Sequence, residues 1–194
     1  MNDTIKWAMA INDDPRMSED EMIWLYERIK ELYEGGNTLE IGAYRGMLSY
    51  LFAHRVHESG RPESKHVIVD AFDIPIDIDE ENTHHYGDHT EALMLKNMGA
   101  YADKVKTVRS KSLDWLGANT VIEGDFDMVF IDGDHRDPIV YLELTLCGNS
   151  VKHILGHDYG WPGVTASVDR FCKEKGYKIY QPLSGRGVFE LIKE

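Results

Sequence analysis

Acidic and histidine side chains stand directly after several apolar runs of this 194-residue sequence. Asp70 ends one run, Asp132 ends another, and His157 with Asp158 follows a third. Buried carboxylates are costly unless something pairs with them, so acids at these positions indicate a shared ligand pocket. A histidine adds a group whose pKa lies near the working pH, which suits a general base.

The stretch from residue 39 to 46 organises the rest of the chain. Leu39 and Ile41 flank Glu40, and Gly42 and Gly46 follow. A glycine after a strand lets the backbone turn sharply and lets a ligand approach the main chain, while the first amides of the next helix lack partners. An acid with two glycines suits a ligand that carries hydroxyls and an amine. The dinucleotide fingerprint needs a third glycine and usually no acid here.

Apolar periodicity predicts the elements that position these residues. It predicts strands near 37–41, 66–70, 105–109, 127–132 and 151–155, and helices over 18–33, 44–58, 88–102, 112–116, 137–146 and 163–175. Residues 177–180 and 187–192 alternate, which predicts an antiparallel hairpin at the sheet edge. The expected fold class is α/β, a doubly wound Rossmann-like sheet with helices on both faces, whose ligand lies at the carboxyl ends of the strands.

The pattern Glu-Ile-Gly-x-x-x-Gly-x-x-Ser, from Glu40 to Ser49, resembles motif I of the class I S-adenosylmethionine (SAM) dependent methyltransferases. It looks most like their small-molecule O-methyltransferase branch, which includes catechol-type enzymes and enzymes that modify antibiotic sugars. Residues 37–194 as a whole resemble the seven-stranded sheet of that family. The resemblance implies direct displacement of the methyl group of SAM by a hydroxyl of a small molecule.

The resemblance also implies a set of SAM-binding residues at the strand tips. These are Glu40, Gly42, Ala43, Tyr44, Gly46, Ser49, Asp70, Ser112 and Asp132. Asp70 is expected to accept hydrogen bonds from both ribose hydroxyls, with Asp73 as a rival for that role. Ser112 falls where the family has a serine near the adenine ring, although a helix N-cap explains it equally well.

Catechol-type relatives hold a magnesium ion with an acid after the fourth strand and an adjacent pair after the fifth. By resemblance the metal ligands here are Asp132, His157 and Asp158, with Asp134 close enough to replace Asp132. A divalent cation would lower the pKa of the acceptor hydroxyl and orient it. His157 stands where those relatives have an oxygen donor, which shifts the preference from magnesium toward manganese, iron or zinc. Alternatively His157 is the general base, and His135 competes for that role.

The remaining segments carry fewer indications of structure and function. Residues 1–36 are expected to hold a mobile lead-in, up to residue 16, and one helix with a capping box at Ser18 and Glu21, ahead of a core at 37–194 in a single domain. The aperiodic segment 71–88 contains His84 and His85 and is expected to be a long loop that acts as a solvated lid.

Composition limits the partners. The formal net charge of -13 disfavours nucleic acid, and no apolar run is long enough to span a bilayer. Cys147 and Cys172 are expected to be buried thiols, and a cytoplasmic location follows from them and from the polar N-terminus. Helices such as 17–33 often lie at dimer contacts, so a homodimer is one expectation. The alternative functions are an NAD-type oxidoreductase and a SAM-binding module without catalysis.

Overall fold

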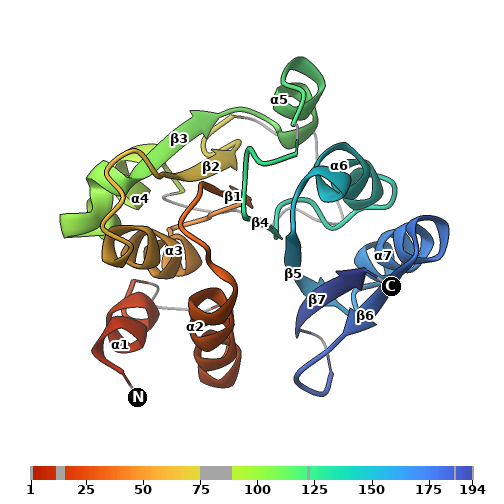
Figure 1. Cartoon of the computed structure of the whole chain (residues 1–194), viewed down its shortest axis with the longest axis horizontal. Helices are drawn as coiled ribbons and strands as arrows, with labels where there is room; N and C mark the ends of the chain where they lie inside the picture. Colours follow the sequence, from red (N-terminus) through yellow and green to blue (C-terminus); the bar gives the residue numbers. More distant parts are fainter. Residues whose placement is uncertain (1, 12–15, 75–88, 122, 186, 194) are drawn as a thin grey trace.

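The computed structural model describes residues 2–11, 16–74, 89–121, 123–185 and 187–193. Within them the strands form one seven-stranded sheet of order β3-β2-β1-β4-β5-β7-β6 (Figure 1). The strands are β1 Thr38–Ile41, β2 His66–Asp70, β3 Val105–Arg109, β4 Met128–Ile131, β5 His153–Tyr159, β6 Tyr177–Tyr180 and β7 Gly187–Lys193. The first five are parallel, and β7 runs antiparallel between β5 and β6. The predicted doubly wound fold with its terminal hairpin is confirmed.

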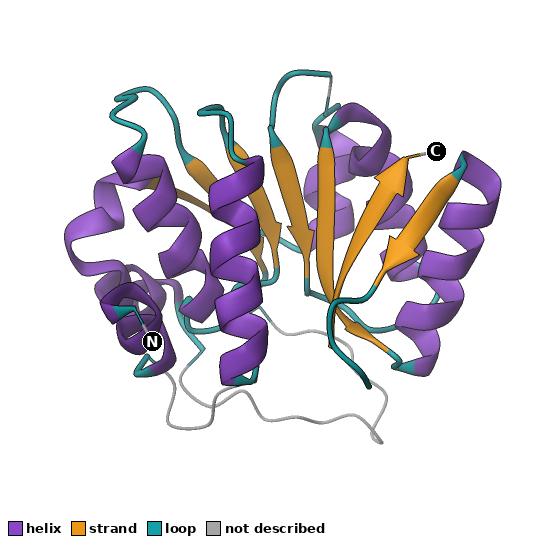
Figure 2. Ribbon diagram, turned by 60° about the horizontal axis from the view of Figure 1, so that its bottom comes forward, coloured by secondary structure: helices purple, strands orange, loops and turns teal. Residues whose placement is uncertain are grey.

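Helices cover both faces of the sheet (Figure 2). One face carries α1 Asp3–Met9, α2 Glu19–Leu32, α3 Met47–Glu58 and α4 Glu91–Met98. The other carries α5 Ser112–Ala118, α6 Ile139–Cys147 and α7 Pro162–Lys175. Short 3-10 helices at Gly99–Lys104 and Gly148–Ser150 follow α4 and α6. No helix in the described ranges combines the length and apolarity that a membrane span requires.

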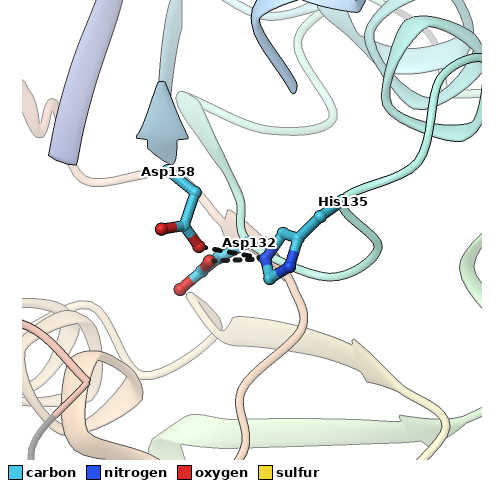
Figure 3. Close-up of side chains that lie close together, drawn as sticks. All are labelled: Asp132, His135 and Asp158. Atoms are coloured by element: carbon cyan, nitrogen blue, oxygen red, sulfur yellow. Dashed lines mark ion pairs between the residues drawn. The ribbon is translucent and has the colours of Figure 1, made fainter. Parts of the chain in front are cut away.

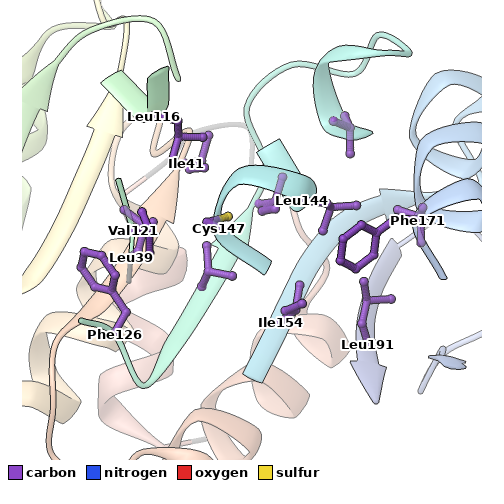
Figure 4. Close-up of a cluster of buried hydrophobic side chains, with 14 of the residues drawn as sticks. Leu39, Ile41, Leu116, Val121, Phe126, Leu144, Cys147, Ile154, Phe171 and Leu191 are labelled. Carbon is purple, nitrogen blue, oxygen red and sulfur yellow. The ribbon is translucent and has the colours of Figure 1, made fainter. Parts of the chain in front are cut away.

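Successive side chains of β1 point to opposite faces of the sheet, as in any strand. Leu39 and Ile41 join the cluster beneath α5, α6 and α7, together with Leu144 and Phe171 (Figure 4). Glu40 points the other way, toward α3. The two cysteines are free and buried, as expected from their apolar settings.

Two segments differ from the prediction. Residues 1–16, expected to be a lead-in without regular structure, contain α1, whose N-cap Asn2 accepts a hydrogen bond from the Thr4 amide at 2.7 Å. Only Ile5 and Ala8 of this helix are buried, which is too few for a visible period. In addition, β5 continues to Tyr159 because its second half pairs with β7, so the residues expected after the fifth strand lie within it.

An ion pair between half-buried Arg28 and buried Glu190 joins α2 to β7. The Arg28 guanidinium donates from Nε and Nη2 to the two carboxylate oxygens of Glu190, at 2.8 and 2.7 Å, and Glu190 is 3% exposed. Because Arg28→Ala leaves a buried carboxylate without its partner, we expect it to lower the free energy of unfolding by about 3 kcal/mol in urea titrations. The double variant Arg28→Met/Glu190→Leu is expected to recover most of that loss. An unchanged urea midpoint for Arg28→Ala would show that the pair contributes nothing.

Candidate active site

The turn between β1 and α3 lies against the tip of β4. Gly42 has a φ of +83°, and Gly46, the N-cap of α3, has a φ of +89°. A Cβ on Gly42 would lie 2.3 Å from the carbonyl oxygen of Asp132, so only glycine fits. The Asp132 amide in turn donates to the carbonyl of Ile41 at 2.8 Å. The turn therefore sits between β1 and β4, where the strand order reverses and ligands of such sheets bind.

Asp70 holds the same turn from the side of β2. Its Oδ2 accepts hydrogen bonds from the amides of Ala43 and Tyr44, at 2.6 and 3.1 Å. Its Oδ1 accepts from the amide of Phe72 at 2.6 Å and lies 3.2 Å from Nε2 of His89. A carboxylate offers about four acceptor positions, and backbone amides use three of them here. The ribose contact expected of Asp70 would therefore have to use the position that faces His89 or displace one of the amides.

Asp132, His135 and Asp158 bring three potential ligand atoms together at the ends of β4 and β5 (Figure 3). One donor atom of each lies within 4.8 Å of the others. Nε2 of His135 is 3.0 Å from Oδ2 of Asp158 and 3.9 Å from Oδ1 of Asp132. This buried nitrogen nevertheless makes no well-aligned hydrogen bond among the described residues. Two carboxylates and one imidazole whose donor atoms surround a common point suit a cation, and without one His135 forms an ion pair with Asp158.

The charges of this cluster are strongly coupled. The carboxylates of Asp132 and Asp158 raise the pKa of His135 to about 10, so without a cation its ring carries a positive charge. Burial acts to raise the pKa of Asp158, but His135 and His157 hold it far below its usual range. Asp158 also has a φ of +58°, an uncommon conformation for a residue with a side chain.

His157 faces the same carboxylates from the protein interior and is 8% exposed. Its Nδ1 lies 3.3 Å from Oδ2 of Asp158 and 3.7 Å from Oδ1 of Asp132, and its Nε2 lies 3.1 Å from Oε1 of Glu21. Burial acts to lower the pKa of His157, but Asp132 and the other two carboxylates raise it to about 12. A protonated, buried ring does not suit the base role expected of His157. The group of three side chains whose donor atoms lie close together contains His135, and not His157, beside Asp132 and Asp158.

The sequence matches a family model described as a methyltransferase domain over residues 39–159, which run from β1 to the end of β5. The match covers more than half of the chain. The chain belongs to this methyltransferase family. This match confirms the family resemblance inferred from the turn after β1. No curated protein matches the sequence of this chain.

Solved structures with the same fold accompany the family match. An O-methyltransferase from Bacillus cereus in complex with SAH is 16% identical, with 100% of this chain and 92% of that chain covered, at a TM-score of 0.66. TomG from Streptomyces achromogenes, an O-methyltransferase of tomaymycin synthesis solved with SAM, is 15% identical, with 100% and 91% covered, at a TM-score of 0.66. SAH-bound PaMTH1 from Podospora anserina is 13% identical, with 99% and 86% covered, at 0.62.

Two residues of the methyltransferase motif, Glu40 and Ser49, lie inside the protein. Oε2 of Glu40 accepts a hydrogen bond from Oγ of Ser49 at 2.5 Å and pairs with Nε2 of His66 at 2.7 Å. Burial, opposed by His66, raises the pKa of Glu40. Both side chains are nearly inaccessible, so the direct cofactor contact expected of them does not fit the structure. Instead they fix α3 against β1 and so hold the glycine turn in place.

Ser112 begins α5, and its hydroxyl donates to Oε1 of Glu143 at 2.5 Å. Glu143 on α6 is fully buried, and its Oε2 has no hydrogen-bond partner among the described residues. Burial raises the pKa of Glu143 to about 8. The adenine contact expected of Ser112 therefore competes with its bond to this acid.

Glu143 should make the stability of the methyltransferase depend on pH. Its carboxyl ionises near pH 4.5 when unfolded and near 8 when folded, so between these values the folded state holds a proton that the unfolded chain has lost. Stability therefore falls as pH rises from about 4.5 to about 8, by at most about 5 kcal/mol. Glu143→Gln should flatten this slope in urea titrations at pH 5, 7 and 9, and Ser112→Ala should keep it. Parallel profiles of wild type and Glu143→Gln would contradict the assignment.

Sequence reasoning does not identify Glu21 or Glu143 as neighbours of the site. Glu143 stands among apolar residues of a helix, which is the one available signal that it is buried. Glu21 is explained fully by its helix cap, and its contact with His157 spans 136 residues. No local pattern contains such a contact.

Three further expectations have different outcomes. The loop expected at 71–88, with His84 and His85, lies outside the described residues from residue 75 onward. Asp73, the rival to Asp70, pairs with Nε of Arg109 at 2.7 Å on the surface. Asp134 bonds the Arg136 guanidinium next to it, so it does not replace Asp132 in the cluster.

Proposed function

We propose that this protein transfers the methyl group of SAM to a hydroxyl group of a small molecule. The observation that carries the proposal is the contact between the glycine turn after β1 and the tip of β4 that bears Asp132. It puts the turn expected to bind SAM beside the cluster expected to hold the acceptor. The neighbours whose structures contain SAM or SAH support the choice of cofactor.

The chemistry asks the protein mainly for alignment. Displacement at a sulfonium needs no covalent intermediate, so much of the rate comes from placing donor and acceptor in line. The acidic cluster of Asp132 and Asp158 is compatible with the positive sulfonium. The ring of Trp161, whose centroid lies 5.7 Å from that of His135, adds an apolar surface beside the cluster. We infer that the acceptor lies between these groups.

A divalent cation fits the cluster. Asp132, His135 and Asp158 would hold it, and two carboxylates with one imidazole favour manganese, iron or zinc over magnesium. When bound, the ion would lower the pKa of the acceptor hydroxyl and orient it. Metal binding requires a neutral imidazole, so it displaces the proton that His135 otherwise holds. His135 therefore serves this proposal as a ligand better than as a general base.

Isothermal titration with SAM and with NAD separates the proposed activity from the oxidoreductase alternative. We expect heat with SAM and none with NAD. Binding of NAD without binding of SAM would overturn the proposal. Turnover of a panel of hydroxylated acceptors with a chelator and with added Mn²⁺ or Mg²⁺ then tests the cation. Activity that is unchanged in chelator would remove the cation and leave the methyl transfer standing.

A further inference from the structure

Glu21 connects the N-terminal helix α2 to the cation cluster, although it lies outside the part of the chain that matches the methyltransferase family. Its two carboxylate oxygens have separate tasks. Oε2 accepts hydrogen bonds from the amide and the hydroxyl of Ser18, at 2.7 and 2.8 Å, and so completes the capping box of α2. Oε1 points the other way and lies 3.1 Å from Nε2 of His157.

The position of this second oxygen is sterically defined. A Cβ on Gly187, the first residue of β7, would lie 2.5 Å from Oε1 of Glu21, so the glycine leaves room for the carboxylate to enter. The side chains of Glu21 and His157 are only 10% and 8% exposed. Helix α2, strand β7 and strand β5 thus enclose the contact, and a surface cap would not need this enclosure.

The ring of His157 extends the connection to the cluster. With Nε2 held by Glu21, its Nδ1 faces Asp158 at 3.3 Å and Asp132 at 3.7 Å. These are the two carboxylates of the proposed cation site, and His135 lies on their other side. Groups that orient the ligands of a metal typically change its affinity about 10–100-fold when they are removed.

We propose that Glu21 is a positioning residue of the cation site. It fixes the ring of His157, which in turn fixes the carboxylates of Asp132 and Asp158. The proposal rests on the proposed use of a cation by this cluster. It gives α2 a role in the reaction beyond covering the sheet, because the same carboxylate that begins the helix sets the geometry of the ligands.

Two variants separate this role from helix capping. Glu21→Gln keeps the side-chain volume and remains compatible with a capping box, which accepts glutamine at this position. If the amide oxygen serves the cap, the amide NH₂ faces Nε2 of His157, so the ring loses its acceptor. Ser18→Ala does the reverse, because it weakens the cap and leaves Oε1 of Glu21 on His157. The expected loss of stability for Ser18→Ala is about 1 kcal/mol.

The experiment measures the affinity of each full-length protein for Mn²⁺ by isothermal titration, together with its melting temperature. We expect Glu21→Gln to bind Mn²⁺ at least 10-fold more weakly than wild type while it keeps the helix cap. Ser18→Ala should melt lower and bind Mn²⁺ as wild type does. Equal affinity of Glu21→Gln and wild type would overturn the role of Glu21 alone. A wild-type protein that binds no Mn²⁺ would overturn the cation site and this role together, and SAM binding would still report on the methyltransferase.

Discussion

Asp132→Asn is expected to reduce the rate of methyl transfer roughly 100-fold or more at saturating SAM. The substitution keeps the size of the side chain but removes the charge that faces both His135 and His157. The proposed cation then loses one of two anionic ligands, and the histidines lose a common partner. Initial rates with a methylated-product assay, together with Mn²⁺ titration, measure the two effects separately.

Asp134→Asn is the matched control for Asp132→Asn. The two acids stand two residues apart on the same loop, but the Asp134 carboxylate bonds the Arg136 amide and guanidinium. We expect the control to keep its Mn²⁺ affinity and most of its activity. Equal losses in the two variants would mean that negative charge on this loop matters in general, and the specific role of Asp132 would be rejected.

Gly42→Ala is the second change with a large expected effect. Alanine at a positive φ costs about 1–2 kcal/mol, and its Cβ would also overlap the Asp132 carbonyl oxygen, which belongs to the backbone and cannot rotate away. The turn and the tip of β4 must therefore move apart. Because a displacement of about 1 Å can cost about 100-fold in rate, we expect SAM binding and turnover both to fall by at least that factor.

Gly60→Ala is the control that separates the cost of alanine at a positive φ from the cost of steric overlap with the backbone. Gly60 has a φ of +68°, close to that of Gly42, but nothing lies within 4 Å of its Cβ position. This control should lose a similar 1–2 kcal/mol of stability, as melting temperature reports, and keep SAM affinity. If Gly42→Ala bound SAM as tightly as Gly60→Ala, the close approach of the turn to β4 would have no functional importance.

Local patterns were sufficient to predict the sheet and to place most of the acids. Strands β2 and β4 and the first half of β5 contain short apolar runs, and the acids that follow such runs, Asp132 and Asp158 among them, must lie near the carboxyl edge of the sheet. The same local patterns do not show that His135, and not His157, lies in the group with Asp132 and Asp158. That distinction depends on how far β5 continues alongside β7, and that pairing joins segments distant in sequence.

The burial of Glu40 was missed for a related reason. An acid near the end of a strand suggests a ligand contact when only its neighbours in sequence are considered. In the structure its partner is His66, 26 residues later on β2, which reaches it across the sheet. A hydrogen bond between side chains of two strands does not change the apolar periodicity of either strand, so the sequence pattern does not reveal it.

The strand order has a consequence for synthesis of the protein on the ribosome. β5 carries Asp158, yet its outer neighbour is β7, which is translated after α7 and β6. Until β7 emerges, the growing chain presents β5 as an open edge able to pair with other chains. Nascent chains that end before residue 187 should therefore depend on chaperones, and the pairing that completes the edge beside Asp158 can form only after β7 has been translated.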